Sequence, residues 1–436
     1  MDALCRSDFD GDGVVDGADL GVCAEELGAT RCAPGAMPLS WERQLSEFLE
    51  SMPSRGESLR IVDCEGRVLI AAEVVGAGAL VEKPEEGEDD AFSQLGDEPV
   101  GEREPEERRA EDVPVQSQVM RLFHTASKLE FEVTVHGDLL EAIHRYRASQ
   151  GLAGSSLTDD RDLDRLPTAS GWSNGVDSRV QLNATTAWPW RTIANFGGCT
   201  GTLIGPRHII TAAHCINKQG TNQWYSFTVT PGQNGPGSAP FGSSAMSPDP
   251  GPGDPFRWYF TPKQWRDCSS TENCGEWDWG LIIIPDRLGD KTGWMGYVAR
   301  PGSQLNAVGH FNRGYPICPA ACGASDADNS PGQPCNPRRL YGQPASCGLG
   351  SYFNPGPDGW NRNITTSCDM SQGHSGSALY HYFFDPQLNK VVPVVSMVAI
   401  QESCCFCSAT TNFPNTCRRI TPSDLGVISF FRQWKP

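Results

Sequence analysis

Three segments in the last 270 residues of the chain decide its fold. The first is Gly198-Cys199-Thr-Gly-Thr-Leu-Ile-Gly-Pro-Arg-His-Ile-Ile-Thr-Ala-Ala-His214-Cys215. The second is Glu276-Trp-Asp278-Trp-Gly-Leu-Ile-Ile-Ile-Pro285, and the third is Cys368-Asp369-Met-Ser-Gln-Gly373-His374-Ser375-Gly376-Ser-Ala-Leu379. From about Ser170 to Pro436, short β-rich runs alternate with Gly, Pro and Asn turns, a pattern typical of a β-barrel or β-sandwich.

The three segments contain the groups that acyl transfer needs. The Ser375 hydroxyl is a poor nucleophile at neutral pH and needs a base, which His214 can provide. A buried carboxylate must hold the imidazole in the right tautomer, and Asp278 stands at the start of an apolar run. Gly373 and Gly376 flank the serine and allow a tight turn. We therefore expect the amides of Gly373 and Ser375 to form an oxyanion hole.

These motifs resemble those of the chymotrypsin-fold (trypsin-like) serine proteases. The chain order His, Asp, Ser matches that family, with separations of 64 and 97 residues. Gly-His-Ser375-Gly-Ser, Pro231-Gly-Gln-Asn-Gly and Phe260-Thr-Pro-Lys-Gln-Trp265 are more similar to bacterial glutamyl-endopeptidase-like enzymes. The resemblance covers about Gly171 to Trp434. It implies a mostly β fold with two six-stranded barrels, a His214–Asp278–Ser375 triad and a Cys199–Cys215 disulfide.

Specificity depends on residues next to the nucleophile. Asp369 lies six residues before Ser375, the spacing of the acid in the specificity pocket of trypsin. That resemblance implies a preference for Arg or Lys in the substrate, because a carboxylate attracts cations. Preference for Glu would call for a histidine on the following strand, and residues 394–401 contain none. His374 stands where trypsins carry the acid that pairs with a newly cut N-terminus, so we expect no activation of that kind.

A calcium loop is predicted near the start of the chain. Ligands are expected at loop positions 1, 3, 5, 7, 9 and 12, with Gly13 at the turn. The ligands would be Asp8, Asp10, Asp12, the Val14 carbonyl, Asp16 and Asp19. The pattern resembles a dockerin-type repeat, although only one repeat is present where such modules normally have two. The alternative is an Asp/Gly turn cluster that binds nothing. Ca²⁺ would be structural, with no cofactor for catalysis.

The sequence divides into three regions. Residues 1–32 form the calcium-binding repeat, 33–169 a mixed α/β pro-region or accessory region, and 170–436 the protease domain. Between Glu82 and Asp112, 14 acidic and 4 basic residues give a net charge of −10, which predicts a disordered linker. An interaction tail is the alternative. Before and after this linker we expect a helix at 41–52, strands at 59–62, 68–75 and 128–135, and a helix at 139–150.

Composition narrows the functional classes. A net charge of −18 disfavours a nucleic-acid partner, because the phosphate backbone would be repelled. No apolar run is long enough to span a membrane. Met1 is followed by Asp2 with no basic start and no apolar stretch, so no signal peptide is visible. The 17 cysteines nevertheless indicate an oxidising compartment, and we expect a secreted, periplasmic or cell-surface location.

Several further cysteines are expected to form disulfides of open connectivity. The sequence groups are Cys268/Cys274, Cys318/Cys322, Cys335/Cys347 and the cluster Cys404-Cys405-Phe-Cys407…Cys417. Zinc binding is the alternative for the last cluster, but that cluster has neither a CxxC pair nor a nearby histidine.

Together these features predict a secreted serine endopeptidase that acts on proteins or peptides. The alternative is a catalytically inactive protease fold that serves as a calcium-dependent binding or adhesion module. In either case the N-terminal repeat is the candidate attachment point for a cell-surface or scaffold partner.

Overall fold

The computed structural model describes about three fifths of the chain. The described residues are 41–51, 53–62, 67–83, 116–140, 178–247, 256–269, 274–317, 338–356, 358–371, 373–385, 390–401 and 415–434. The predicted calcium loop and most of the predicted acidic linker lie outside these residues.

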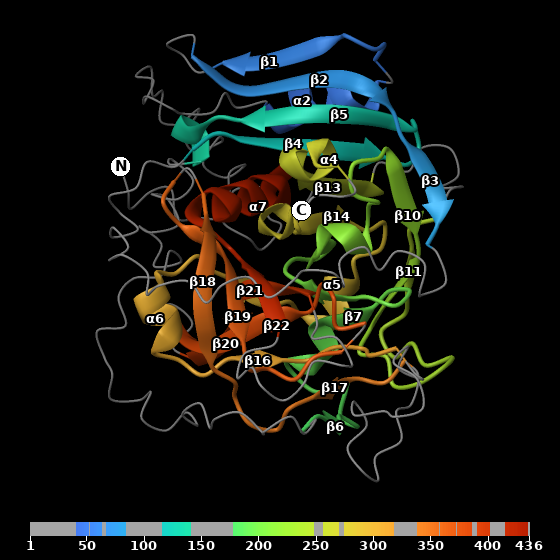
Figure 1. The fold of residues 1–436 in the computed structure, drawn as a ribbon. Helices are drawn as coiled ribbons and strands as arrows, with labels where there is room; N and C mark the ends of the chain where they lie inside the picture. The colour runs from blue at the N-terminus through green and yellow to red at the C-terminus, as the bar shows by residue number, and fades with distance from the viewer. Residues whose placement is uncertain are drawn as a thin grey trace, which may run out of the picture.

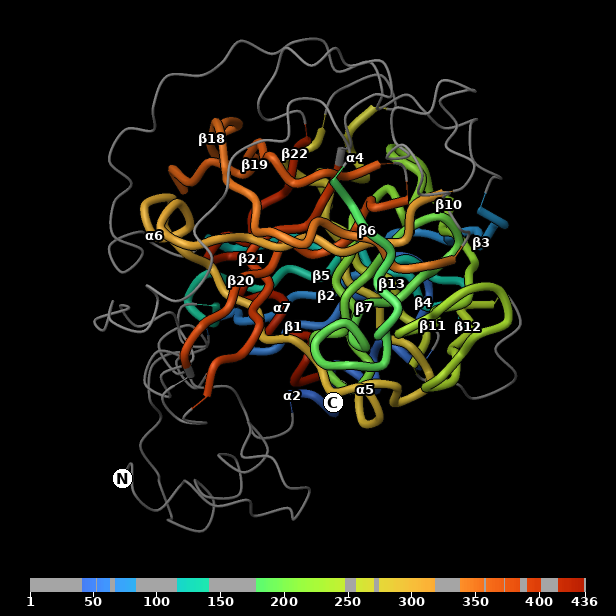
Figure 2. The backbone as a smooth tube through the Cα atoms, turned by 90° about the horizontal axis from the view of Figure 1, so that it is seen from below, coloured from blue at the N-terminus to red at the C-terminus, as the bar shows by residue number. Residues whose placement is uncertain are grey.

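The described residues form a mostly β structure with few helices, as the sequence predicted (Figure 1). Two large sheets carry most of the strands. In Figure 1 the N-terminal strands lie as a layer at the top, and the strands of the second sheet lie below them, in orange and red. Figure 2 shows the same arrangement from below, with the N-terminal strands behind the rest of the described strands.

The first sheet contains eleven strands. In spatial order they are β1 (Ser58–Val62), β2 (Val68–Ala77), β5 (Leu129–Val135), β4 (Gln118–His124), β13 (Trp258–Pro262), β14 (Gly280–Ile283), β9 (His208–Thr211), β8 (Thr200–Leu203), β7 (Ile193–Asn195), β11 (Thr228–Pro231) and β12 (Ser244–Ala245). The first four come from the predicted accessory region and the other seven from the predicted protease domain. The two regions therefore share one sheet, joined where β4 pairs antiparallel with β13.

Side chains as well as backbones join the two regions. The ring of His124 on β4 stacks on Trp258 of β13, with ring centroids 4.2 Å apart. The buried Glu130 carboxylate accepts hydrogen bonds from Trp224 Nε1 at 2.7 Å and from Arg266 at 2.9 Å. A buried carboxylate requires such partners, because burial without them is costly. The strands of the predicted accessory region are thus part of the same core as the strands of residues 170–436.

The second sheet contains seven strands, all antiparallel except β15. They are β16 (Phe311–Asn312), β20 (Ala378–Asp385), β21 (Lys390–Gln401), β22 (Asn415–Arg419), β19 (Asn361–Thr366) and β18 (Leu349–Pro355), with β15 (Gly296–Tyr297) parallel to β21. Two strand pairs lie outside the large sheets: β3 (Ala79–Glu82) with β10 (Gln223–Ser226), and β6 (Val180–Gln181) with β17 (Tyr341–Gly342).

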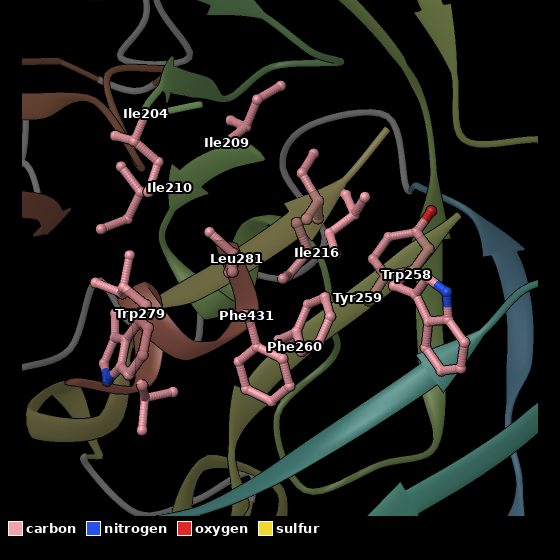
Figure 3. Packing of buried hydrophobic residues seen from close by; sticks show 14 of the residues in the cluster. Ile204, Ile209, Ile210, Ile216, Trp258, Tyr259, Phe260, Trp279, Leu281 and Phe431 are labelled. Atoms are coloured by element: carbon pink, nitrogen blue, oxygen red, sulfur yellow. The ribbon is translucent and has the colours of Figure 1, made fainter. Parts of the chain in front are cut away.

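Helix α7 (Pro422–Trp434) begins with a reciprocal cap. The Thr421 hydroxyl accepts a hydrogen bond from the Asp424 amide at 3.4 Å, and the Asp424 carboxylate accepts one from the Thr421 amide at 2.9 Å. This arrangement satisfies two amides that the first helical turn would leave unpaired. The helix then packs on the first sheet, with Phe431 4.4 Å from Phe260 between ring centroids (Figure 3). Its C-terminal Trp434 donates to Ser46 in α2 (Trp41–Glu50).

The remaining helices are short. Those described completely are α4 (Lys263–Asp267), α5 (Leu288–Thr292), α6 (Gly302–Asn306) and the 3₁₀ turns η3 (Trp190–Thr192), η4 (Ala213–Cys215) and η5 (Gly275–Trp277). Residues 137–140 are also helical, and the rest of the helix predicted at 139–150 lies outside the described residues. Within the part of the chain that the structure describes, no helix combines the length and apolar character needed to cross a membrane.

Two sequence predictions differ from the structure, one in a boundary and one in a disulfide partner. The linker was predicted to begin at Glu82, but Glu82 ends strand β3, because that strand pairs with β10. Cys347 bonds to Cys368, not to the Cys335 with which its spacing grouped it. The Cys268–Cys274 bridge is present, and Cys417 is buried in β22. Cys318, Cys322 and the 404–407 cluster lie outside the described residues.

Candidate active site

Strand register brings His214 and Asp278 to the same end of the first sheet. β9 and β14 are antiparallel, and Thr211 lies opposite Gly280. Asp278 comes two residues before Gly280, while His214 comes three residues after Thr211 in the turn η4. Both residues therefore lie just beyond the same end of the β9–β14 pair and contact each other, although 64 residues separate them in sequence.

Both oxygens of the Asp278 carboxylate bond to His214. Oδ2 lies 2.7 Å from the ring Nδ1, and Oδ1 accepts the backbone amide of His214 at 2.9 Å. The carboxylate is fully buried, whereas the histidine side chain is 26% exposed. Because a carboxylate accepts a proton donor at Nδ1, the neutral ring carries its lone pair on Nε2. The ring is thus held in the tautomer in which Nε2, the nitrogen on the side away from the acid, can act as a base.

The loop that carries Ser375 is held against the histidine turn. Gly376 has a φ of 81°, and a Cβ atom there would collide with the Thr211 hydroxyl and the Thr200 carbonyl. Gly373 has a φ of 95°, and a Cβ atom there would collide with the Tyr315 carbonyl. Only glycine combines this backbone conformation with such close packing. The two glycines that flank the serine are therefore required by the packing of the loop.

Thr200 ties these parts together, and its role was not foreseen from the sequence. Its amide donates to the Ser375 carbonyl at 2.8 Å, and its hydroxyl donates to the Gly373 carbonyl at 2.8 Å. Its own carbonyl accepts the Thr211 hydroxyl at 3.0 Å. One residue of β8 thus connects the serine loop to the histidine strand. The only sequence signal was its position after Cys199 in the first motif.

The structure places Asp369 beside Ser178. Asp369 Oδ2 accepts the Ser178 amide at 2.8 Å and the Ser178 hydroxyl at 2.5 Å. Ser375, six residues later, is 7% exposed. Asp369 therefore lies on the same loop as the candidate nucleophile, and its Oδ2 atom is bound within the protein.

Cys199 and Cys215 form the predicted disulfide, with their Cα atoms 6.0 Å apart. Among the described residues, Cys199, His214 and Cys215 are the one group of side chains near enough together to hold a metal ion. The disulfide already uses both sulfurs, and zinc binds the thiolate form of cysteine. The oxidised pair therefore does not fit a metal site. The six predicted calcium ligands lie outside the described residues.

Residues 180–238 match the Trypsin family. The chain is therefore related to the trypsin-like serine proteases of the chymotrypsin fold, and glutamyl endopeptidases are among its relatives.

Two curated relatives illustrate the relationship. A glutamyl endopeptidase of Bacillus licheniformis is 32% identical over 147 residues, which are 33% of this chain and 41% of that protein. An extracellular metalloprotease of Bacillus subtilis strain 168 is 25% identical over 195 residues, 42% of this chain and 56% of that protein. The chain thus spans about half the length of these relatives.

Two solved structures are also similar. A Glu endopeptidase in complex with MPD aligns with a TM-score of 0.41 and 20% identity, covering 59% of this chain and 98% of that one. The protease Anisep from Arthrobacter nicotinovorans aligns with a TM-score of 0.33 and 15% identity, covering 60% and 99%.

Proposed function

We propose that the protein is a serine endopeptidase in which His214, Asp278 and Ser375 form the catalytic triad. The observation that carries the proposal is the His214–Asp278 pair: a fully buried carboxylate 2.7 Å from the imidazole, on a turn against which the serine loop packs. A structural histidine would not need a buried acid to fix its tautomer, whereas a general base does.

The proposed reaction assigns one task to each of these groups. His214 Nε2 takes the hydroxyl proton of Ser375 as Oγ adds to the substrate carbonyl carbon. The amides of Gly373 and Ser375 would stabilise the oxyanion, and each such donor is typically worth about 3 kcal/mol of barrier. The imidazolium then protonates the leaving amine, and the C–N bond breaks to leave an acyl-enzyme. Water, deprotonated by the same nitrogen, releases the acid and regenerates Ser375.

The first experiment is labelling with a fluorophosphonate, which reacts with activated serines. The full chain should be labelled once, at Ser375, and Ser375→Ala should abolish both labelling and peptide hydrolysis. Ser429→Ala is a matched control, because Ser429 is also buried but bonds to Leu425 in α7. Labelling that persists in Ser375→Ala would refute the assignment. An unlabelled wild-type chain would favour the inactive binding module instead.

We further propose that the enzyme prefers Arg or Lys before the scissile bond, with Asp369 as the residue that attracts them. The support is the position of Asp369 on the nucleophile loop and the charge of its carboxylate. Mass spectrometry of products from a mixed peptide library would test this preference. Cleavage mainly after Glu, as the name of the B. licheniformis relative indicates for that protein, would refute it.

The protein is also proposed to be secreted and to bind Ca²⁺ through Asp8–Asp19. Three disulfides among the described residues and an extracellular relative support secretion. The calcium loop rests on its ligand spacing alone. Isothermal titration of the full chain with Ca²⁺ would test it, and Asp8→Asn with Asp12→Asn should remove the binding. A cell-surface or scaffold partner would attach through the same repeat.

A further inference from the structure

A short segment before β6 contacts the nucleophile loop at three points. Ser178 bonds to Asp369, near the start of this loop. The guanidinium of Arg179 donates to the Ser371 hydroxyl at 2.5 Å and lies 3.2 Å from His374 Nε2. The contacts thus extend from six residues to one residue before Ser375. We call Ser178 and Arg179 the strap.

The strap is itself held firmly. It continues into β6, which pairs antiparallel with β17, and the Leu182 amide donates to the Leu340 carbonyl at 2.8 Å. Just after β17, Gln343 accepts the Asp369 amide at 2.8 Å. The strap and the start of the nucleophile loop are therefore anchored to the same strand pair.

Arg179 begins a directional chain of hydrogen bonds that passes around the nucleophile. Because an arginine can only donate, His374 Nε2 accepts, and Nδ1 then donates to Asn312 Oδ1 at 2.8 Å. The Asn312 amide group donates to the Ser377 hydroxyl at 2.6 Å. His374 and Ser377 lie on either side of Ser375, so the chain holds both flanks of the residue.

All the groups in this chain are shielded from water. Arg179 is 6% exposed, Ser371 4%, Asn312 3%, and His374 and Ser377 are fully buried. Burial and the neighbouring cations Arg179 and Arg313 lower the pKa of His374 well below its ordinary value, which keeps the ring neutral and able to accept. Hydrogen bonds in such surroundings fix geometry strongly, because an unpaired partner would be costly.

The structure assigns Arg179 a positioning role: its guanidinium holds His374, and through it the turn that aims the Gly373 and Ser375 amides. This inference rests on the proposed function. Trypsins order the same turn with an acidic residue and a new N-terminus, as noted for position 374. In this protein the cation is the side chain of Arg179 in the strap, and its partner on the loop is the neutral ring of His374 in place of an acid.

The test compares three full-length variants by fluorophosphonate kinetics and by peptide hydrolysis. Arg179→Met removes the donors, and Arg179→Lys leaves a single ammonium that cannot span Ser371 and His374 as a guanidinium does. Arg191→Met is the matched control: Arg191 donates to the Thr292 carbonyl and lies over the Trp188 ring, and both of these partners are outside the nucleophile loop. Thermal unfolding of each variant reports structural damage separately.

We expect Arg179→Met to lower the limiting rate of serine labelling and kcat about 10²-fold, the typical cost of a lost oxyanion donor, with little change in KM. Added guanidinium ion should restore part of this rate in Arg179→Met and none in the control. Equal rates in Arg179→Met and Arg191→Met would overturn the inference. If Arg179→Met does not fold, Arg179→Lys decides: a folded variant with the wild-type rate would overturn it. An unlabelled wild-type chain would instead refute the proposed function.

Discussion

His310 allows a quantitative prediction about acid stability. The ring is fully buried, its Nε2 lies 2.9 Å from the Leu305 carbonyl, and its Nδ1 has no hydrogen-bond partner among the described residues. Burial and the nearby Arg300 guanidinium lower the pKa of His310 from 6.5 to about 4. A proton added to Nδ1 would therefore be buried without an acceptor, beside an arginine and the ring of His381 5.5 Å away.

The sign and size follow from linkage. Below about pH 6.5 the unfolded chain binds a proton at this histidine while the folded chain does not, so acid favours unfolding until about pH 4. At about pH 5 the difference amounts to about 2 kcal/mol of unfolding free energy. Burial also lowers the pKa of His208, His374 and His381. The wild-type chain should therefore lose several times this amount between neutral pH and about pH 5.

The assay is urea unfolding of the wild-type chain and His310→Gln at about pH 7.5 and about pH 5. Gln cannot take up a proton, so the variant should be less stable at the higher pH but should lose about 2 kcal/mol less on acidification. His136→Gln, at a half-buried loop position, provides the control and should show the wild-type drop. Equal losses in His310→Gln and the wild type would refute the reasoning.

Three more predictions concern catalysis, packing and calcium. Asp278→Asn should lower kcat about 10⁴-fold, because an amide favours the wrong imidazole tautomer, and steady-state kinetics near wild-type values would assign the role to another carboxylate. Asp424→Ala should cost about 3–5 kcal/mol in urea unfolding, because it leaves the buried Arg418 guanidinium without the carboxylate 2.9 Å away, and a cost below about 1 kcal/mol would contradict this. Excess EDTA should leave peptide hydrolysis by the full chain unchanged, since none of the six predicted calcium ligands belongs to the proposed triad; complete loss would show that catalysis depends on a bound metal ion.

The candidate site could be predicted only where its chemistry is local in sequence. Each triad residue stands in a short motif whose neighbours have a physical purpose, such as Gly376 against the histidine strand. Thr200 stands in the first motif, but no neighbour there indicates its role, and Arg179 stands in no motif. Arg179 lies 192 residues from Ser371 and 195 from His374, so only the folded chain shows that they meet. The catalytic roles themselves stay predictions until the labelling experiment.

The fold divides in the same way. Apolar spacing predicted helix 41–50 and strands 58–62, 68–77 and 129–135 to within a few residues, because burial on one face leaves a period in the sequence. The choice of partner strand leaves no such period in the sequence. β3 received no prediction, since its four residues are ordered by β10, about 140 positions away. The bond of Cys347 to Cys368 likewise depends on the pairing of β18 with β19.

The pairing of β4 with β13 has a consequence for biosynthesis. Residues 118–124 leave the ribosome long before residues 258–262, and until then β4 is an open edge with an apolar face. Such edges invite pairing with other chains, and late closure slows folding. Strand β4 therefore stays unpaired on one edge until β13 has been synthesised, and β13 can then pair with it at once. We expect translation pauses or chaperone binding between these two points to control the yield of native protein more than events in the rest of the chain.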